Sequence, residues 1–487
     1  MDASAVAPMI EAALPSGARH RQLSARSWLI GILLCLGDGR PAHLSRAHEA
    51  LVGLPEPDRA RLGVTELWRQ GPHLLTYRQM WHTSALVLAV LAKASPDGEP
   101  SKCLQGLADA ILGASVPAWA AQLSRSLAVD WTDVESFARP PVPDMRPSAD
   151  PEASWGHRKG NRPGQKDELF YGYYLSAATM VDEEGGPSTP ELVRRVTLSS
   201  CHVDPVPAFV AVLEAMAASG MALGDVLADS GYAHRVPQNW ALRLRRAGAK
   251  VVTDLHPADR GPQGTHEGAV RCNGNLYCPA VPKALLRLGP LGRDASAAAI
   301  ADHDKKTTEL AHYKLSRTCS DDTDGYHRVA CPAVMGKLRC PARPASMALA
   351  HNRPTVESPP EHPPTCCTQQ TVTVPPEVNA KTAQKHDYAS AAWRHSYARR
   401  TAAERTYSTI KDPASNDISR GWCRLTGLAP MLVFVTCCIA VRNLRVLAAF
   451  EARQREDARR QAAGLPPKSR RRRRKSVNDL VSAATPP

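Results

Sequence analysis

Four residues near the carboxyl end of the chain have types and a spacing that suit phosphate chemistry. They are Tyr397, Arg400, Glu404 and Lys411, in a stretch without a helix breaker until Pro413. At about 100° per residue, these positions fall on one face of a helix. A carboxylate on such a face can hold a divalent cation while Arg and Lys neutralise phosphate oxygens. The alternative is a solvent-exposed helix face whose charges pair at i,i+4 spacing.

Two aspartates far upstream each close a short apolar run. These are Asp130 and Asp229. At the mouth of an α/β sheet, the ends of strands point groups into the crevice where ligands bind. Each aspartate also has a structural alternative, an N-cap or turn for Asp130 and an Asx-turn for Asp229. Asp133 and Glu135 are neighbouring candidates for the first carboxylate.

The carboxylates of Asp130, Asp229 and Glu404 are hard oxygen ligands, which suit Mg²⁺ or Mn²⁺ rather than zinc. Two such ions, held about 3.5–4 Å apart, stabilise the attacking and leaving oxygens of an in-line phosphoryl transfer. If two strand ends and one packed helix bring the three side chains together, they form a two-metal site for phosphodiester chemistry.

The segments around these residues predict a mixed α/β sheet with helices on its faces. β-branched and aromatic runs and helical periodicities give the order strand, two hairpin-like strands, helix, strand, helix, strand. The stretch 140–164 is rich in proline and charge and is predicted to be loop. The predicted strands are 127–130, 169–181, 192–199, 225–229 and 249–255, and the predicted helices are 204–219 and 237–247.

The spacing of Tyr397, Arg400, Glu404 and Lys411 resembles the Y-(2)-R-(3)-E-(6)-K signature of bacterial insertion-sequence DDE transposases. Asp130-Trp-Thr-Asp-Val-Glu-Ser resembles the first-aspartate strand of that family, and Val-Leu-Ala-Asp229-Ser-Gly-Tyr resembles its second-aspartate strand. The resemblance covers about residues 125–255 and 386–445. It implies a ribonuclease H-like core.

The resemblance also implies roles for these residues. Two Mg²⁺ or Mn²⁺ ions would be coordinated by Asp130, Asp229 and Glu404. The DNA near the element ends would be contacted by Tyr397, Arg400 and Lys411. The expected reaction is hydrolytic nicking at those ends, followed by attack of the freed 3′-hydroxyl on target DNA. The expected partners are double-stranded DNA and a second copy of the chain, as a homodimer on paired ends.

Two other functions fit the same residues. One is a nuclease on the same core that does not transfer strands, and the other is an inactive derivative that only binds DNA. The cysteine-bearing, proline-rich insertion differs from the β-strand insertion of the best-known relatives, so the resemblance does not fix a hairpin pathway of cleavage.

Composition and length bound the class of protein. The chain has 487 residues and a net charge of +14 at pH 7, which favours a polyanionic partner over an acidic small molecule. Its length allows several domains. We expect a helical N-terminal domain, either DNA-binding or a plain bundle, a catalytic core in two parts, an insertion between them, and a basic tail. The N-terminal domain is expected at 1–122, the core at 123–255 and 386–450, the insertion at 256–385 and the tail at 451–487.

Two further basic segments are candidates for phosphate contacts. Arg158 and Lys159 lie in a Gly/Pro-containing loop, and Arg471 and Arg472 lie in the basic tail. The alternatives are a solvated loop and a tail that only aids solubility.

The insertion contains most of the cysteines that bear on metal binding. Cys331, Cys340, Cys366 and Cys367 are the candidate ligands of a structural zinc ion. Cys272, Cys278 and Cys319 are further thiols, and His351 and His362 are substitutes. Free thiols in a loop-rich region are the alternative.

The expected location is the cytoplasm, in association with the nucleoid and without a membrane partner. No secretory signal is apparent, so the 13 cysteines are expected to be reduced. The longest late apolar run, 431–441, is half a membrane span and is predicted to be a buried helix.

Overall fold

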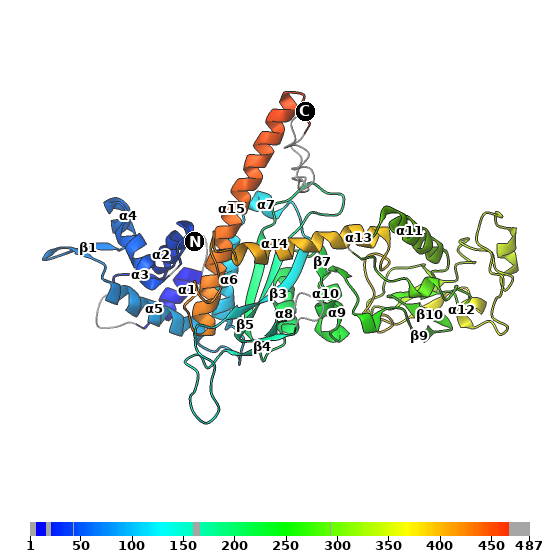
Figure 1. The fold of residues 1–487 in the computed structure, drawn as a ribbon, viewed down its shortest axis with the longest axis horizontal. Coiled ribbons are helices and arrows are strands. Elements are labelled where there is room, and N and C mark those ends of the chain that lie inside the picture. Colours follow the sequence, from blue (N-terminus) through cyan, green and yellow to red (C-terminus); the bar gives the residue numbers. More distant parts are fainter. Residues whose placement is uncertain (1–5, 16–20, 42, 159–165, 293, 467–487) are drawn as a thin grey trace, which may run out of the picture.

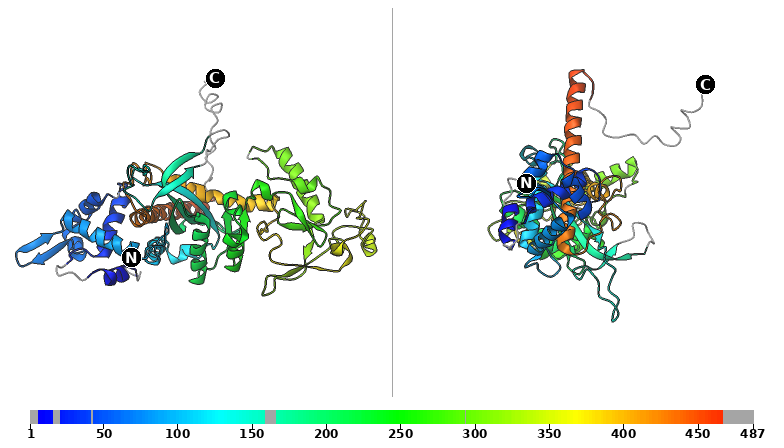
Figure 2. Two further views of the ribbon diagram at one scale, coloured as in Figure 1. Left: turned by 90° about the horizontal axis from the view of Figure 1, so that it is seen from below. Right: turned by 90° about the vertical axis from the view of Figure 1, so that its left-hand side faces the viewer.

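The computed structural model describes residues 6–15, 21–41, 43–158, 166–292 and 294–466. A helical N-terminal part, a central sheet and an insertion follow one another along the long axis of the molecule (Figures 1 and 2). The N-terminal part and the insertion therefore lie at opposite ends, with the sheet between them.

The central sheet has the strand order β4-β5-β3-β7-β8, and β6 also pairs with β5. β5 is antiparallel to its three neighbours, whereas β7 is parallel to both β3 and β8. The first residues of β5 pair with β4 and the remainder with β6. The six strands are β3 (Leu127–Glu135), β4 (Ser154–Arg158), β5 (Glu168–Met180), β6 (Val193–Ser200), β7 (Asp225–Ala228) and β8 (Lys250–Thr253).

Helices cover both faces of this sheet because its strands alternate their apolar side chains. Leu127 and Val129 share an apolar cluster with the helix that follows β6. Ala128, between them, points to the other face and packs beneath the helices that follow the insertion. The helices on the first face are α8 (Pro205–Ala218) and α10 (Ala241–Arg246), and those on the second are α13 (Ala391–Tyr397), α14 (Thr401–Ile410) and α15 (Leu428–Ala462).

The helix α15 supplies much of the core. Among the described helices, it alone is long and apolar enough to cross a membrane by length and composition. Its apolar half is buried against β6 and the N-terminal helices. Asn443 exchanges two hydrogen bonds of 2.9 Å with the backbone of Val193 on β6. The prediction of a buried helix at 431–441 is therefore confirmed, and packing inside the protein accounts for its apolar character.

The N-terminal part shares its hydrophobic core with α15 and with β5 and β6. It also contains a β-hairpin that the sequence did not indicate, at the far end of the molecule (Figure 1). Its elements are α1 (Val6–Ala13), α2 (Ala25–Gly37), α3 (Leu44–Val52), α4 (Glu56–Arg61), β1 (Thr65–Trp68), β2 (Gly71–Leu74), α5 (Tyr77–Ala92), α6 (Lys102–Ala114) and α7 (Ala118–Ala121).

The insertion is more regular than predicted. It contains two three-stranded antiparallel sheets around two small apolar clusters. The first sheet has β9 (Pro262–His266), β10 (Ala269–Cys272) and β11 (Asn275–Tyr277), and the second has β12 (Ser316–Arg317), β13 (His327–Ala330) and β14 (Val372–Val374). Its helices include α11 (Ala297–His312) and the single turn α12 (Thr365–Thr368).

Three predicted elements differ from the structure. The stretch 140–164, predicted to be loop, contains β4, which covers the otherwise unpaired edge of the first half of β5. The predicted strand 127–130 continues to Glu135 because β5 pairs with its whole length. The predicted helix 237–247 is a 3₁₀ turn, Pro237–Asn239, followed by α10.

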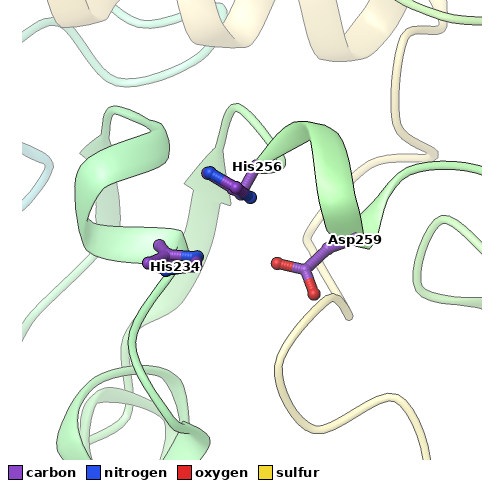
Figure 3. Close-up of side chains that lie close together, drawn as sticks. All are labelled: His234, His256 and Asp259. Atoms are coloured by element: carbon purple, nitrogen blue, oxygen red, sulfur yellow. The ribbon is translucent and has the colours of Figure 1, made fainter.

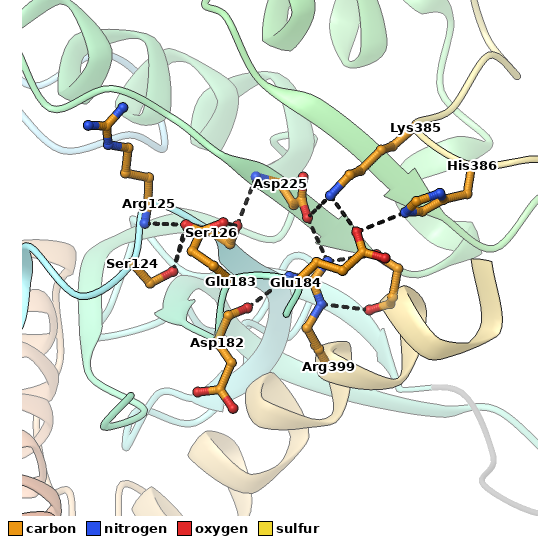
Figure 4. A network of polar contacts seen from close by, with 11 residues as sticks. Ser124, Arg125, Ser126, Asp182, Glu183, Glu184, Asp225, Lys385, His386 and Arg399 are labelled. Carbon is orange, nitrogen blue, oxygen red and sulfur yellow. Dashed lines mark hydrogen bonds and ion pairs between the residues drawn. The ribbon is translucent and has the colours of Figure 1, made fainter. Parts of the chain in front are cut away.

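A buried ionic network fastens the end of the insertion to the sheet (Figure 4). The Asp225 side chain, only 3% exposed at the start of β7, accepts hydrogen bonds from Lys385 at 2.8 Å and Arg399 at 2.6 Å. Lys385 and His386 also donate to Glu184, at 2.5 and 2.9 Å. Burial raises the pKa of Glu184, but the bonds from Lys385 and His386 outweigh this and hold it at about 2.

We expect Asp225→Asn to lower the free energy of unfolding by about 3 kcal/mol, because it leaves the largely buried Arg399 without an anion and Lys385 with Glu184 alone. Equilibrium unfolding in urea measures this loss. Glu214→Gln is the matched control, since it breaks the more exposed pair with Arg243 and should cost about 1 kcal/mol or less. Equal losses in the two variants would show that the network is not a structural anchor.

Candidate functional site

Asp130 and Asp229 lie side by side at one edge of adjacent parallel strands. Leu127 pairs with Val226 and Ala128 with Leu227. Continuing this register by two residues sets Asp130 beside Asp229, just where β7 ends and β3 continues. Residues paired in this way point to the same face of the sheet.

Asp229 is held by the turn that follows it. It is the N-cap of α9 (Ser230–Ala233), and its Oδ1 accepts from the backbone N–H of Gly231 at 2.9 Å and of Tyr232 at 3.4 Å. The Asx-turn considered from the sequence is therefore present, and it leaves Oδ2 as the oxygen for a ligand. Gly231 is required because a Cβ there would lie 2.7 Å from the Trp131 ring.

The helix α14 carries Glu404 across β3 and β5. The Tyr407 hydroxyl donates to the carbonyl oxygen of Asp130 at 2.5 Å and to that of Leu175 at 3.2 Å. The Thr406 and Thr179 hydroxyls lie 3.0 Å apart. These buried bonds fix the rotation of α14 over the sheet. The Glu404 side chain stays 44% exposed and lies close enough to Asp130 for its charge to raise the pKa of that carboxyl.

Arg400 connects the helix to the sheet. Its guanidinium pairs with Glu404 and lies 3.6 Å from Oδ2 of Asp130. The Tyr397 ring lies under the same guanidinium at 5.6 Å and is itself stacked on Trp393. The i,i+4 ion pair considered from the sequence is therefore present, between Arg400 and Glu404. The Arg400 guanidinium also lies near the Asp130 carboxylate on β3.

The electrostatics of the site reflect this crowding of carboxylates. Burial raises the pKa of Asp130 to about 7, and the charges of Asp229 and Glu404 add to the rise, while Arg400 opposes it. Burial lowers the pKa of Arg400, but Tyr397 and the three carboxylates together raise it above its usual value. Burial is the largest contribution in both cases, and the charges of the neighbouring groups add to it or oppose it. Within the described ranges, the ligand oxygens of Asp130, Asp229 and Glu404 do not all lie within 4.8 Å of one another.

Lys411, at the end of α14, reaches β3 at residues beyond Asp130. Its Nζ is 2.8 Å from Oγ1 of Thr132 and 3.1 Å from Oδ1 of Asp133. Arg158 on β4 also binds Asp133, at 2.5 Å, and Glu135, at 2.9 Å. Asp133 and Glu135 are thus neutralised by cations, which distinguishes them from Asp130.

The segment 397–411, predicted as one helix, is divided. α13 ends at Tyr397, a 3₁₀ turn spans Ala398–Arg400, and α14 follows. Arg399 in this turn binds the buried Asp225, so tertiary contacts tighten the backbone there. Lys411 is the C-cap of α14 rather than part of its last turn.

Three of the predicted DNA contacts lie outside the described residues, namely Lys159, Arg471 and Arg472. Arg158, the remaining candidate in the two basic segments, pairs with Asp133 and Glu135. Its role toward DNA stays a prediction.

The predicted zinc ligands Cys331, Cys340, Cys366 and Cys367 are all buried. The Sγ atoms of Cys366 and Cys367 are 4.0 Å apart. Burial raises the pKa of Cys278 to about 12, and charges on Cys331, Cys367 and Cys340 would add to the rise, so Cys278 lies near this set. Among the described residues no three thiols meet within 4.8 Å, and zinc in the insertion stays a prediction.

One group of ligand-bearing side chains was not anticipated from the sequence. His234, His256 and Asp259 converge at the junction of the sheet and the insertion. The sequence holds only a weak signal for them, since the two histidines stand 22 positions apart in separate loops.

The chain was compared with protein-family models, with curated proteins and with solved structures, and none of the three comparisons gives a match. The geometry of the site therefore supplies the evidence for its function.

The raised pKa of Asp130 gives a test of this geometry. Because the pKa in the folded chain, about 7, exceeds the usual 3.8, the folded state holds a proton that the unfolded state loses. The free energy of unfolding should therefore fall as the pH rises from about 4 to 7. Asp130→Asn removes this loss, and we expect it to be more stable than the unmodified chain by about 2 kcal/mol at pH 8 without divalent ions.

Urea unfolding at pH 5 and pH 8 measures the effect, with the exposed Glu361→Gln as control. The two variants should differ in their pH dependence. An Asp130→Asn chain with the same pH profile as the control would mean that Asp130 is not crowded by other carboxylates.

Proposed function

We propose that this chain is a DDE transposase, which cleaves DNA at the ends of a mobile element and joins the freed 3′-hydroxyl to target DNA. One observation carries the proposal. Arg400 pairs with Glu404 and lies 3.6 Å from Asp130, and the charge of Asp229 also acts on Asp130, although the three residues come from distant parts of the sequence.

The strand order supports a ribonuclease H-like core. Apart from β4, the strands lie side by side in the order β6-β5-β3-β7-β8, and β5 is antiparallel to β3. Asp130 is on β3, Asp229 directly follows β7, and Glu404 is on α14, which crosses the sheet. The resemblance to the DDE transposases implies such an arrangement.

The donor set fits hard divalent cations. Arg400 is in contact with two carboxylates, those of Asp130 and Glu404, and burial together with the charges of Asp229 and Glu404 raises the pKa of Asp130 to about 7. Asp130, Asp229 and Glu404 would hold Mg²⁺ or Mn²⁺. When bound, such ions lower the pKa of an attacking hydroxyl and neutralise charge on the reacting phosphate.

The side chains of the chain itself have separate tasks in this proposal. Arg400, which is 13% exposed, keeps Glu404 directed toward Asp130 and offers its remaining N–H groups to a phosphate oxygen. Tyr397 limits the rotation of that guanidinium by packing under it. Tyr407 holds the backbone of Asp130 in place through a buried hydrogen bond.

A polar cavity along β3, beyond Asp130 and not lined by the three carboxylates, supports a path for DNA. It has a volume of about 530 Å³ and is lined by residues of β3 and β4 and of the segment after α14. Its cations, Arg158, Lys411 and Arg420, are set among Asp133 and Glu135. We infer that phosphate groups displace these carboxylates from the cations when DNA enters.

The first test of the proposed function is Glu404→Gln. The amide retains the shape of the side chain but is a poor ligand for Mg²⁺, so we expect DNA cleavage to fall by about a thousandfold or more. Binding to the same DNA should change little. Labelled DNA that flanks the reading frame, incubated with the full chain and Mg²⁺, reports cleavage, joining and binding together.

The same assay separates the alternatives, with Glu361→Gln as the matched control. Joined products support a transposase, whereas cleavage without joining indicates a nuclease. Binding without cleavage by the unmodified chain indicates an inactive derivative. Full activity of Glu404→Gln would refute the metal-binding role of this side chain.

A second test concerns the cavity. Lys411→Met should weaken the binding of duplex DNA about equally for all sequences, because the lost contact is to phosphate. The slope of log K against log salt concentration should decrease in magnitude by about 1. Lys283→Met, an exposed lysine in the insertion, is the control and should leave the slope unchanged. Fluorescence anisotropy over a salt series measures both, and equal slopes for the two variants would exclude Lys411 from the DNA path.

A further inference from the structure

Two histidines and an aspartate meet outside the carboxylate site, where the insertion joins the central sheet. His234 follows α9, His256 precedes the 3₁₀ turn Pro257–Asp259, and Asp259 is the last residue of that turn. One ligand atom from each residue lies within 4.8 Å of the others. Figure 3 shows His256 and Asp259 on this turn, with His234 close to them on a separate segment.

The two imidazoles are suitable donors. Their ring centroids are 4.1 Å apart, with the planes inclined at 39°. The proximity of His256 lowers the pKa of His234, because two adjacent imidazolium charges repel. Neutral imidazole is the form that binds metal ions.

The carboxylate of Asp259 is paired with one protein cation. Its Oδ1 accepts a hydrogen bond from Lys381 at 2.9 Å, and the same Nζ lies 2.7 Å from Oδ2. A metal ion bound between Asp259 and the histidines would replace or share this ammonium partner.

We propose that His234, His256 and Asp259 bind a divalent transition-metal ion of the zinc class. Two nitrogens and one carboxylate oxygen favour Zn²⁺, Co²⁺ or Ni²⁺ over Mg²⁺. The site therefore differs in metal preference from the three carboxylates at Asp130. His234 is exposed, so water completes the coordination.

The position of the three residues suggests what the ion does. His234 belongs to the loop that begins at Asp229, whereas His256 and Asp259 lie where the chain leaves β8 for the insertion. Lys381, beside Asp259, lies on the segment that returns from the insertion. A bound ion would fasten the Asp229 loop to the neck of the insertion and so stabilise their relative placement.

Two groups compete with the metal ion for its ligands, so substitutions can be chosen that should strengthen or weaken metal binding. The ammonium group of Lys381 is paired with the Asp259 carboxylate. Nδ1 of His256 accepts a long hydrogen bond of 3.3 Å from the Ala258 N–H. Removing the Lys381 charge should therefore strengthen metal binding, whereas removing a ligand should weaken it.

The experiment is a zinc titration of the full chain against a chromophoric chelator, without DNA and without Mg²⁺. Thiols also bind zinc, so the readout is the difference between variants with all cysteines retained. His234→Ala and Asp259→Asn should each lower the affinity of one zinc site by at least about 100-fold. Lys381→Met should raise it by about tenfold, and the exposed His82→Ala is the control.

Thermal unfolding of the same variants supplies the second measurement. Zinc should raise the Tm of the unmodified chain and of Lys381→Met, and it should raise that of His234→Ala less. Unchanged zinc binding in both ligand variants would overturn the proposal, as would weaker binding in Lys381→Met. Neither measurement depends on the proposed DNA chemistry, so the two proposals fail or succeed separately.

Discussion

The contact of Arg400 with Asp130 and Glu404 is the interaction on which the candidate site depends. Three carboxylates gathered at one edge of a sheet repel one another, and one guanidinium offsets only part of that repulsion. Burial raises the pKa of Asp130 to about 7, and the charges of Asp229 and Glu404 add to the rise. A site with this charge persists only if its surroundings hold it in place. The hydrogen bonds of Tyr407 and the turn after Asp229 provide that support.

This support is necessary because the residues of the site come from distant parts of the chain. Asp130 and Asp229 come from the first part of the core, but Arg400 and Glu404 arrive only after the whole insertion. The buried Asp225 receives Lys385 and Arg399 as the chain returns, so the helix bearing Glu404 begins from a fixed point. α15 then packs into the core that the N-terminal helices share. The central sheet is therefore stabilised from both ends of the sequence.

Much of this sheet was predictable from local patterns. Strands β5, β6, β7 and β8 and the helix α8 follow from β-branched runs and helical periodicity, and the spacing of Arg400 and Glu404 gives their pairing directly. Other features depend on contacts between distant segments. β4 forms because β5 offers it an edge, and the 3₁₀ turn before α14 accompanies the bond of Arg399 to Asp225. Lys411 shares the spacing of the signature, yet it binds Asp133 on another part of the sheet. The proximity of His234 to Asp259 could not be predicted from any spacing in the sequence.

The most direct test of the account is crystallographic, with Mn²⁺ as an anomalous scatterer in crystals of the full chain grown at pH 8. The account predicts anomalous peaks in contact with the Asp130 carboxylate and shared with Asp229 and Glu404. Manganese bound elsewhere, with these three carboxylates separated or bound only to protein cations, would contradict it.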